Sequence, residues 1–284
     1  MIYHAYAPRH PALQPYIQQL WHISQAKGDA LEVTPRMLPD GCYHMVVNLG
    51  APHRYIDRNG RAHAPKRTHM NARHTDYVTV QRSGEVEIMG VVFQPYGLYP
   101  FVRLPMKEVA GAVRDMEDLL GPRVREMEER LYAASTVRHK LLELEACLLS
   151  FLSPEHEVKR EVVAASQMLR QRHGLMTVRG LLHEFHLSER TLERYFQHDL
   201  GMSPKQFANI QRMQYVLQVL KSSPQDKLVH AAMDGEFYDQ AHFIHTFKKM
   251  VGMTPQAYLR TQDLLSDLYN PDAGQAGKIE WNGL

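Results

Sequence analysis

The chain has 284 residues, of which 44% are hydrophobic and 23% charged, and a formal net charge of +2; this composition is typical of a globular protein and excludes a disordered one. No apolar run approaches the roughly 20 residues that cross a bilayer, and the N-terminus lacks the pattern of a secretory signal. The two cysteines provide neither a disulfide framework nor a paired zinc motif, so we expect a cytoplasmic protein.

The first 105 residues predict a β-rich domain. Apolar or alternating runs are separated by turn signals, among them Pro39-Asp40-Gly41, Ser83-Gly84 and the hairpin pair Asn59-Gly60. The strand-like runs lie at 43–49, 77–81 and 85–93. Several short strands joined by turns indicate a small sandwich or barrel.

After Pro105 the apolar pattern becomes helical, with a spacing of three and four residues. The residues that recur in this way are Val124, Met127, Leu131, Leu141, Leu144, Leu148 and Leu152. Ser153-Pro154-Glu155 then predicts a break between domains, because proline disfavours helix at the residue before it. From His156 to about Leu268 the sequence predicts helices separated by short turns.

Two stretches of this last segment, 174–207 and 226–258, share one pattern. Each has a short apolar helix, a tight turn, a second helix that ends in an aromatic residue, and then Gly-Met-Ser/Thr-Pro. An offset of about 51 residues aligns Ser188 with Asp239, Leu192 with Phe243, Phe196 with Phe247 and Gly201 with Gly252. Ser and Asp cap helix N-termini, glycine ends helices, and proline favours the first helical position. The repeat therefore predicts two helix-turn-helix units.

The segment between the two units predicts a single helix over 204–221. Eighteen helical residues span roughly 27 Å. That length suits a rigid spacer between two recognition helices that enter successive major grooves, about 34 Å apart on one face of DNA. The charge is consistent with this function, since residues 156–262 carry +4, against +1 for 1–155 and −3 for 263–284.

The C-terminal segment resembles the AraC/XylS family of bacterial transcription regulators over about 100 residues. The most specific part is DQAHFIHTFKKMVGMTPQAY at 239–258. Two positions depart from the family pattern: Glu236-Phe237 stands where many members have Gly-Phe, and His245 stands where many have arginine.

The resemblance assigns DNA contacts to both second helices of the repeats. On the first it implies Arg190, Glu193 and Arg194; on the second it implies Ala241, His242 and His245, with Gln240 adjacent. Arginine can bind guanine O6 and N7, glutamate can accept from cytosine N4, and alanine can only contact an apolar group such as a thymine methyl. Contacts to phosphates are expected from Lys205, Gln206, Lys248 and Lys249. The alternative is that Arg190 and Arg194 belong to a solvated helix face and pair with Glu189 and Glu193.

Residues 1–152 resemble the sensory domain that precedes this DNA-binding unit in one AraC-type subgroup, on the stretches HPALQPYIQQLWHI, PDGCYHMVVNLG and GVVFQPYGLYPF. The resemblance implies a β-barrel or cupin-like domain that binds a small effector, followed by dimer helices within 105–152. Ordinary packing against the barrel is an equal alternative for the leucines of those helices. Aromatic and polar residues near the turns are candidates for the effector pocket: Trp21, Tyr43, His44, Asn48, Phe93, Gln94 and Tyr96.

Histidines are frequent in the first 80 residues, but no cupin metal motif and no HExxH pair is present, so we expect no metal and no other cofactor. Cys42 would be a redox sensor only if its thiolate were favoured, and inert packing is the alternative.

We therefore expect an α+β chain with four parts: a β-rich sensory domain (1–105), a helical dimerisation or linker region (106–155), an AraC-type DNA-binding domain (156–268) and an acidic tail (269–284). The expected function is a sequence-specific, non-enzymatic transcription regulator. Its expected partners are double-stranded DNA, a small-molecule effector, a second copy in a homodimer and RNA polymerase, with no membrane. The alternatives are a cupin-like metal-dependent enzyme with an appended DNA-binding unit and a ligand-independent architectural protein. A DNA-repair methyltransferase is excluded, because its zinc site needs four cysteines.

Overall fold

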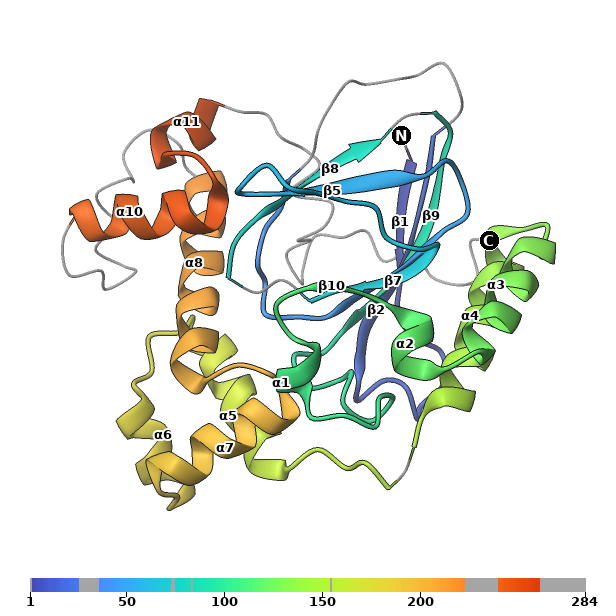
Figure 1. Ribbon diagram of the computed structural model, residues 1–284. Coiled ribbons are helices and arrows are strands. Elements are labelled where there is room, and N and C mark those ends of the chain that lie inside the picture. The colour runs from blue at the N-terminus through green and yellow to red at the C-terminus, as the bar shows by residue number, and fades with distance from the viewer. Residues whose placement is uncertain are drawn as a thin grey trace.

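The computed structural model describes residues 2–25, 36–72, 75–82, 84–153, 155–222 and 240–260. It is an α+β chain, with a β domain formed by the N-terminal part and a helical region formed by the C-terminal part (Figure 1). No helix among the described residues is long and apolar enough to cross a membrane. The predicted acidic tail, Asp239 and the first helix of the second helix-turn-helix unit lie outside the described residues.

The β domain contains two antiparallel sheets. The larger has the order β1 (Ile2–Tyr6), β2 (Ile17–Gln25), β9 (Val86–Phe93), β4 (His44–Asn48), β7 (Thr68–Asn71) and β10 (Val113–Asp115). The smaller has the order β3 (Arg36–Met37), β8 (Val78–Arg82), β5 (His53–Asp57) and β6 (Ala62–His63). The three predicted strand runs are confirmed as β4, β8 and β9, and the Asn59-Gly60 turn joins β5 to β6.

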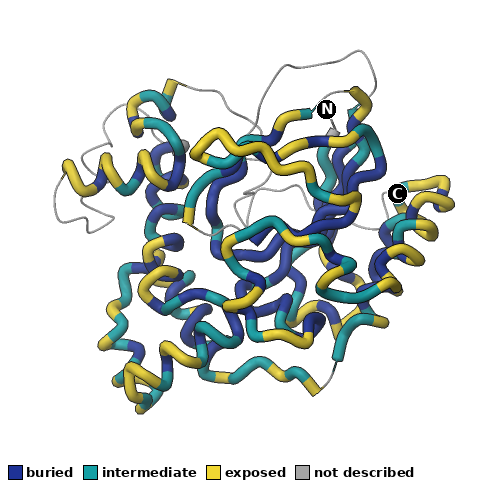
Figure 2. The backbone as a smooth tube through the Cα atoms, in the orientation of Figure 1, coloured by how far each residue is buried: buried dark blue, intermediate teal, exposed yellow. Residues whose placement is uncertain are grey.

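The larger sheet is buried on both faces, because alternate residues of its strands enter two different clusters. Trp21, Ile23 and Ile88 pack between the sheets with Tyr55 and Val80 of the smaller sheet. Their neighbours along the strands point to the other face, which is covered by helices; these neighbours include Leu20, Met45, Val47, Met89 and Val91. Figure 2 shows these strands as the buried centre of the β domain.

Four helices cover the outer face of the larger sheet: α1 (Met106–Val109), α2 (Met116–Leu120), α3 (Arg123–Ala133) and α4 (Val137–Phe151). The predicted apolar positions from Val124 to Leu148 are all buried in the cluster that these helices share with the sheet. Packing against the β domain is thus confirmed for them, and dimerisation through α3 and α4 stays a prediction. The segment predicted as helical also contains a strand, β10, whose three residues pair with β7.

The C-terminal region contains α5 (Arg160–Gln171), α6 (Val178–Phe185), α7 (Glu189–Asp199), α8 (Pro204–Ser222), α10 (Gln240–Val251) and α11 (Pro255–Arg260). The predicted punctuation is confirmed. Ser188 Oγ accepts from the Thr191 amide at 3.2 Å. Gly201 and Gly252 have φ of 74° and 82°, and α8 and α11 each begin at the proline that follows. Helix α8 lies with α5, α6 and α7 at one end and α10 and α11 at the other (Figure 1).

Position 90 on β9 has to be glycine, because the Trp21 indole lies where a side chain at this position would be. A Cβ at position 90 would lie 2.1 Å from Trp21 Cζ2. We predict that Gly90→Ala lowers the free energy of unfolding by about 1–3 kcal/mol, because the ring must leave its position in a packed core. Urea denaturation measures the change. Gly180→Ala on α6 is the matched control, since a Cβ there meets no atom closer than 3.4 Å. Equal stability of the two variants would contradict the packing described here.

Candidate nucleic-acid interface

Helix α7 presents one charged face to solvent. Leu192 and Phe196 are buried beneath it, whereas Arg190, Glu193 and Arg194 are exposed on the opposite side. In the described part of the chain neither arginine forms an ion pair with a neighbouring glutamate, so the alternative in which they pair with Glu189 and Glu193 is not observed. The Arg194 guanidinium lies over the Tyr195 ring, 5.4 Å from its centroid, and both arginines remain exposed to solvent.

The end of α7 is anchored to α5 by a buried carboxylate. Asp199, which is fully buried, accepts hydrogen bonds from the Lys159 amide at 3.0 Å and from Lys159 Nζ at 2.8 Å. Its Oδ1 also lies 2.7 Å from His198 Nδ1. These contacts set the direction of α7 relative to the helix that begins the DNA-binding region.

Helix α10 repeats the division of α7 into a buried side and an exposed side. Phe243 and Phe247 are buried, and the Phe247 ring packs on Tyr258 of α11 with centroids 5.7 Å apart. All the predicted contact residues of this helix are exposed: Gln240, Ala241, His242, His245, Lys248 and Lys249. Buried and exposed residues alternate along α10 in Figure 2. The two recognition helices thus share one geometry, with the predicted DNA contacts on the side away from the core.

The predicted phosphate contacts at the start of α8 differ from each other. Lys205 is exposed. Gln206 is exposed as well, but its side-chain Oε1 accepts a hydrogen bond from the Ser203 backbone amide at 2.9 Å. The Gln206 backbone amide in turn donates to Ser203 Oγ at 3.0 Å. This reciprocal pair is a capping box, which stabilises the helix N-terminus. Only the amide hydrogens of the Gln206 side chain remain for a phosphate.

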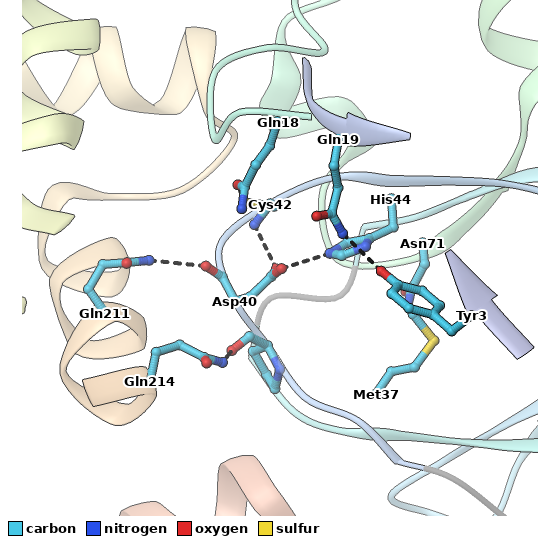
Figure 3. Close-up of polar contacts among 11 residues, drawn as sticks. Tyr3, Gln18, Gln19, Met37, Asp40, Cys42, His44, Asn71, Gln211 and Gln214 are labelled. Atoms are coloured by element: carbon cyan, nitrogen blue, oxygen red, sulfur yellow. Dashed lines mark hydrogen bonds and ion pairs between the residues drawn. The ribbon is translucent and has the colours of Figure 1, made fainter. Parts of the chain in front are cut away.

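The loop between β3 and β4 contacts α8, a contact that sequence reasoning missed (Figure 3). Gln211 Nε2 donates to the Asp40 carbonyl at 3.0 Å, and Gln214 Nε2 donates to the Pro39 carbonyl. Gly41, with φ of 82°, brings the loop so close that a Cβ would lie 2.8 Å from the Phe207 ring. The β domain and the DNA-binding region are therefore joined by both polar and van der Waals contacts.

The same loop reaches back into the β domain through the Asp40 side chain. Asp40 Oδ2 lies 2.8 Å from His44 Nε2, and Oδ1 accepts from the Cys42 amide at 2.8 Å. His44 lines a small cavity that also includes Met37 and Asn71. Its Nδ1 is buried and has no hydrogen-bond partner among the described residues. Asp40 thus connects a polar cavity of the β domain to helix α8.

Both repeated turns touch the β domain as well. Tyr43 Oη donates to the Leu200 carbonyl at 2.8 Å, and a Cβ on Gly201 would lie 2.6 Å from that hydroxyl. A Cβ on Gly252 would lie 2.4 Å from the Tyr77 ring. The equivalent glycine of each helix-turn-helix unit is therefore in contact with a tyrosine of the β domain. Burial raises the pKa of the Tyr43 phenol well above its usual range, so this group remains a donor.

The structure does not gather the seven predicted effector residues around one cavity. Trp21 lies between the sheets, Tyr43 and Phe93 lie under the helices of the outer face, and Tyr96 lies in the core of the DNA-binding region. The polar members have protein partners: His44 pairs with Asp40, Asn48 donates to the Ala51 carbonyl, and Gln94 accepts from Arg170. Tyr43, His44, Gln94 and Tyr96 are thus residues of the junction or of its immediate surroundings.

His53, His69 and Cys42 are buried in the β domain. No group of three or more His, Cys, Asp or Glu suited to a metal occurs in the described ranges. Desolvation lowers the pKa of His53 to about 4 and that of His69 to about 3, and His69 Nε2 lies 2.8 Å from Tyr55 Oη. Burial raises the pKa of the Cys42 thiol far above its usual range. Burial thus disfavours the thiolate that a redox role would need, and Cys42 packs in the cluster between the two sheets.

The sequence matches two protein families, one for each part of the chain. Residues 181–261 match a helix-turn-helix domain family. The C-terminal region is an AraC-type helix-turn-helix domain. Residues 4–115 match a domain family of unknown function (DUF6597), and no curated protein matches the chain. The helix-turn-helix match supports a DNA-binding transcription regulator.

Solved structures similar to this chain include ToxT from Vibrio cholerae. One ToxT structure has 12% sequence identity and a TM-score of 0.43, covering 84% of this chain and 95% of its own. A second, at 1.65 Å resolution, has 12% identity and a TM-score of 0.45, covering 85% and 97%.

The buried Asp199 provides a stability prediction for the first unit. Asp199→Ala removes the acceptor of two hydrogen bonds from Lys159. We expect a loss of about 3 kcal/mol in the free energy of unfolding, since hydrogen bonds to charged groups are the stronger class. Urea denaturation measures it, with Glu184→Ala on the exposed side of α6 as the control carboxylate. A loss below about 0.5 kcal/mol, as for ordinary surface changes, would mean that Asp199 does not anchor α7.

Proposed function

We propose that this transcription regulator reads two successive major grooves with α7 and α10, and that a small effector of the β domain controls it. The observation that carries the proposal is the pair of exposed faces on two helices with matching buried residues, turns and glycines. Helix α8 supports it, because 19 helical residues span about 28 Å, close to the roughly 34 Å between successive grooves.

The chemistry of the α7 face suits base recognition. Arg190 and Arg194 each offer a planar fork of donors for guanine O6 and N7, and Glu193 offers an acceptor for cytosine N4. Lys205, Lys248 and Lys249 lie at helix ends beside these faces and suit phosphate contacts. The overall charge of +2 limits nonspecific attraction, which favours a homodimer on paired sites. The homodimer and a contact with RNA polymerase stay predictions.

The junction supports effector control. A ligand that disturbs the His44–Asp40 contact would also disturb the loop whose carbonyls accept hydrogen bonds from Gln211 and Gln214 of α8. Because α8 joins both units, a displacement of α8 alters the position of one recognition helix relative to the other. Tyr43 and Tyr77 extend the coupling to the turns that end α7 and α10.

Base contacts and phosphate contacts can be distinguished by the dependence of DNA affinity on sequence and on salt concentration. We predict that Arg194→Ala weakens binding to the cognate site by about 1–3 kcal/mol and binding to random DNA far less, because a base contact is lost. Lys249→Ala should weaken both alike and reduce the slope of log K against log salt by about one unit. Fluorescence anisotropy over a salt series measures both variants. Equal losses on both DNAs for Arg194→Ala would remove this residue from base readout, and an unchanged slope for Lys249→Ala would exclude its phosphate contact.

The junction is testable without a known effector. Gln211→Glu replaces the amide that donates to the Asp40 carbonyl by a carboxylate of the same shape. We predict at least about tenfold faster amide hydrogen exchange in the loop 38–43, because the part-buried Asp40 carbonyl loses its partner. Gln218→Glu is the matched control, with the same charge change on an exposed position of the same helix. If both variants exchange at the same rate, the Gln211 contact does not hold the loop on α8.

A further inference from the structure

Helix α10 carries an exposed isoleucine on the face assigned to DNA. Ile244 is 37% exposed and is one of four large hydrophobic residues recorded as exposed in the described chain. It lies one turn after Gln240 and one turn before Lys248, on the flank of the helix between the buried side of Phe243 and the exposed side of His245. A single exposed apolar residue is common on protein surfaces, so its meaning depends on the position that it occupies.

The repeat gives that position a precise equivalent. Helices α7 and α10 begin 51 residues apart, at Glu189 and Gln240, and the glycines that follow them are also 51 residues apart. This offset aligns Ile244 with Glu193, the predicted cytosine contact of the first helix. It also aligns Ala241 with Arg190 and His245 with Arg194. Where α7 has three charged groups, α10 has two apolar side chains and a histidine.

We propose that Ile244, together with Ala241, reads the 5-methyl group of thymine in the half-site bound by α10. In the major groove the 5-methyl group distinguishes thymine from the other bases. An apolar side chain can contact this methyl group. The inference rests on the proposed function, since it takes α10 to lie in a major groove. Its consequence is an asymmetric operator: guanine and cytosine are read by α7, and thymine is read by α10.

The test uses a single methyl group. In vitro selection with the full-length protein yields the operator, and the bases whose preference relaxes in Arg194→Ala identify the α7 half-site. Each thymine of the other half-site is then replaced by deoxyuridine, which removes only the 5-methyl group. We expect one such replacement to weaken wild-type binding about three- to tenfold, the effect of losing one or two buried apolar carbons. Ile244→Ala should bind the thymine and uracil operators equally, and Ile244→Val should retain the discrimination.

Each outcome has a distinct meaning. Wild-type binding that is indifferent to uracil in that half-site overturns the proposal for Ile244, and so does discrimination that persists in Ile244→Ala. Either result leaves the proposed function standing as long as selection returns two half-sites. Failure of the wild-type protein to select any DNA sequence would overturn the proposed function itself. Ile244→Ala changes a side chain outside the core, and thermal melting verifies that the variant remains folded.

Discussion

The contact of the loop 38–43 with helix α8 is the constraint on which the placement of the DNA-reading helices depends. Gly41 permits it, because a positive φ and the absence of a Cβ let the loop lie against Phe207. Gln211 and Gln214 then satisfy two loop carbonyls that burial removes from water. An unsatisfied buried carbonyl costs about 1–3 kcal/mol, so loop and helix are expected to move together.

The two repeated turns have a double role in this arrangement. Gly201 and Gly252 end their recognition helices in a left-handed conformation, and each also lies against a tyrosine of the β domain. A side chain at either position would be strained by its backbone conformation and would collide with the tyrosine. The residue that forms the turn is therefore also the residue that allows the β domain to contact the helix-turn-helix unit. In contrast, α3 and α4 lie on the side of the β domain away from α8 (Figure 1).

Local features of the fold were predictable from sequence, and contacts between distant segments were not. The Ser188 cap, the helix from Pro204 and the Asn59-Gly60 hairpin each depend on a few neighbouring residues, and the 51-residue repeat predicted the faces of α7 and α10. The Asp40–Gln211 hydrogen bond joins residues 171 positions apart and has no local signal. The candidate effector residues are aromatic or polar groups near turns, but the face of the sheet on which each one lies decides where its side chain points. Tyr43 and His44 are adjacent on the chain and enter different surroundings for this reason.

The contact of Gly252 with Tyr77 places the second helix-turn-helix unit against the β domain. The most direct measurement is a spin-label distance between Gln81→Cys on β8 and Gln256→Cys on α11, both exposed positions. The native cysteines do not interfere, since Cys42 and Cys147 are buried. If the β domain holds the second unit in place, we expect one narrow distance distribution in the full-length protein without DNA. A broad distribution would contradict it, because the second unit would then move independently of the β domain.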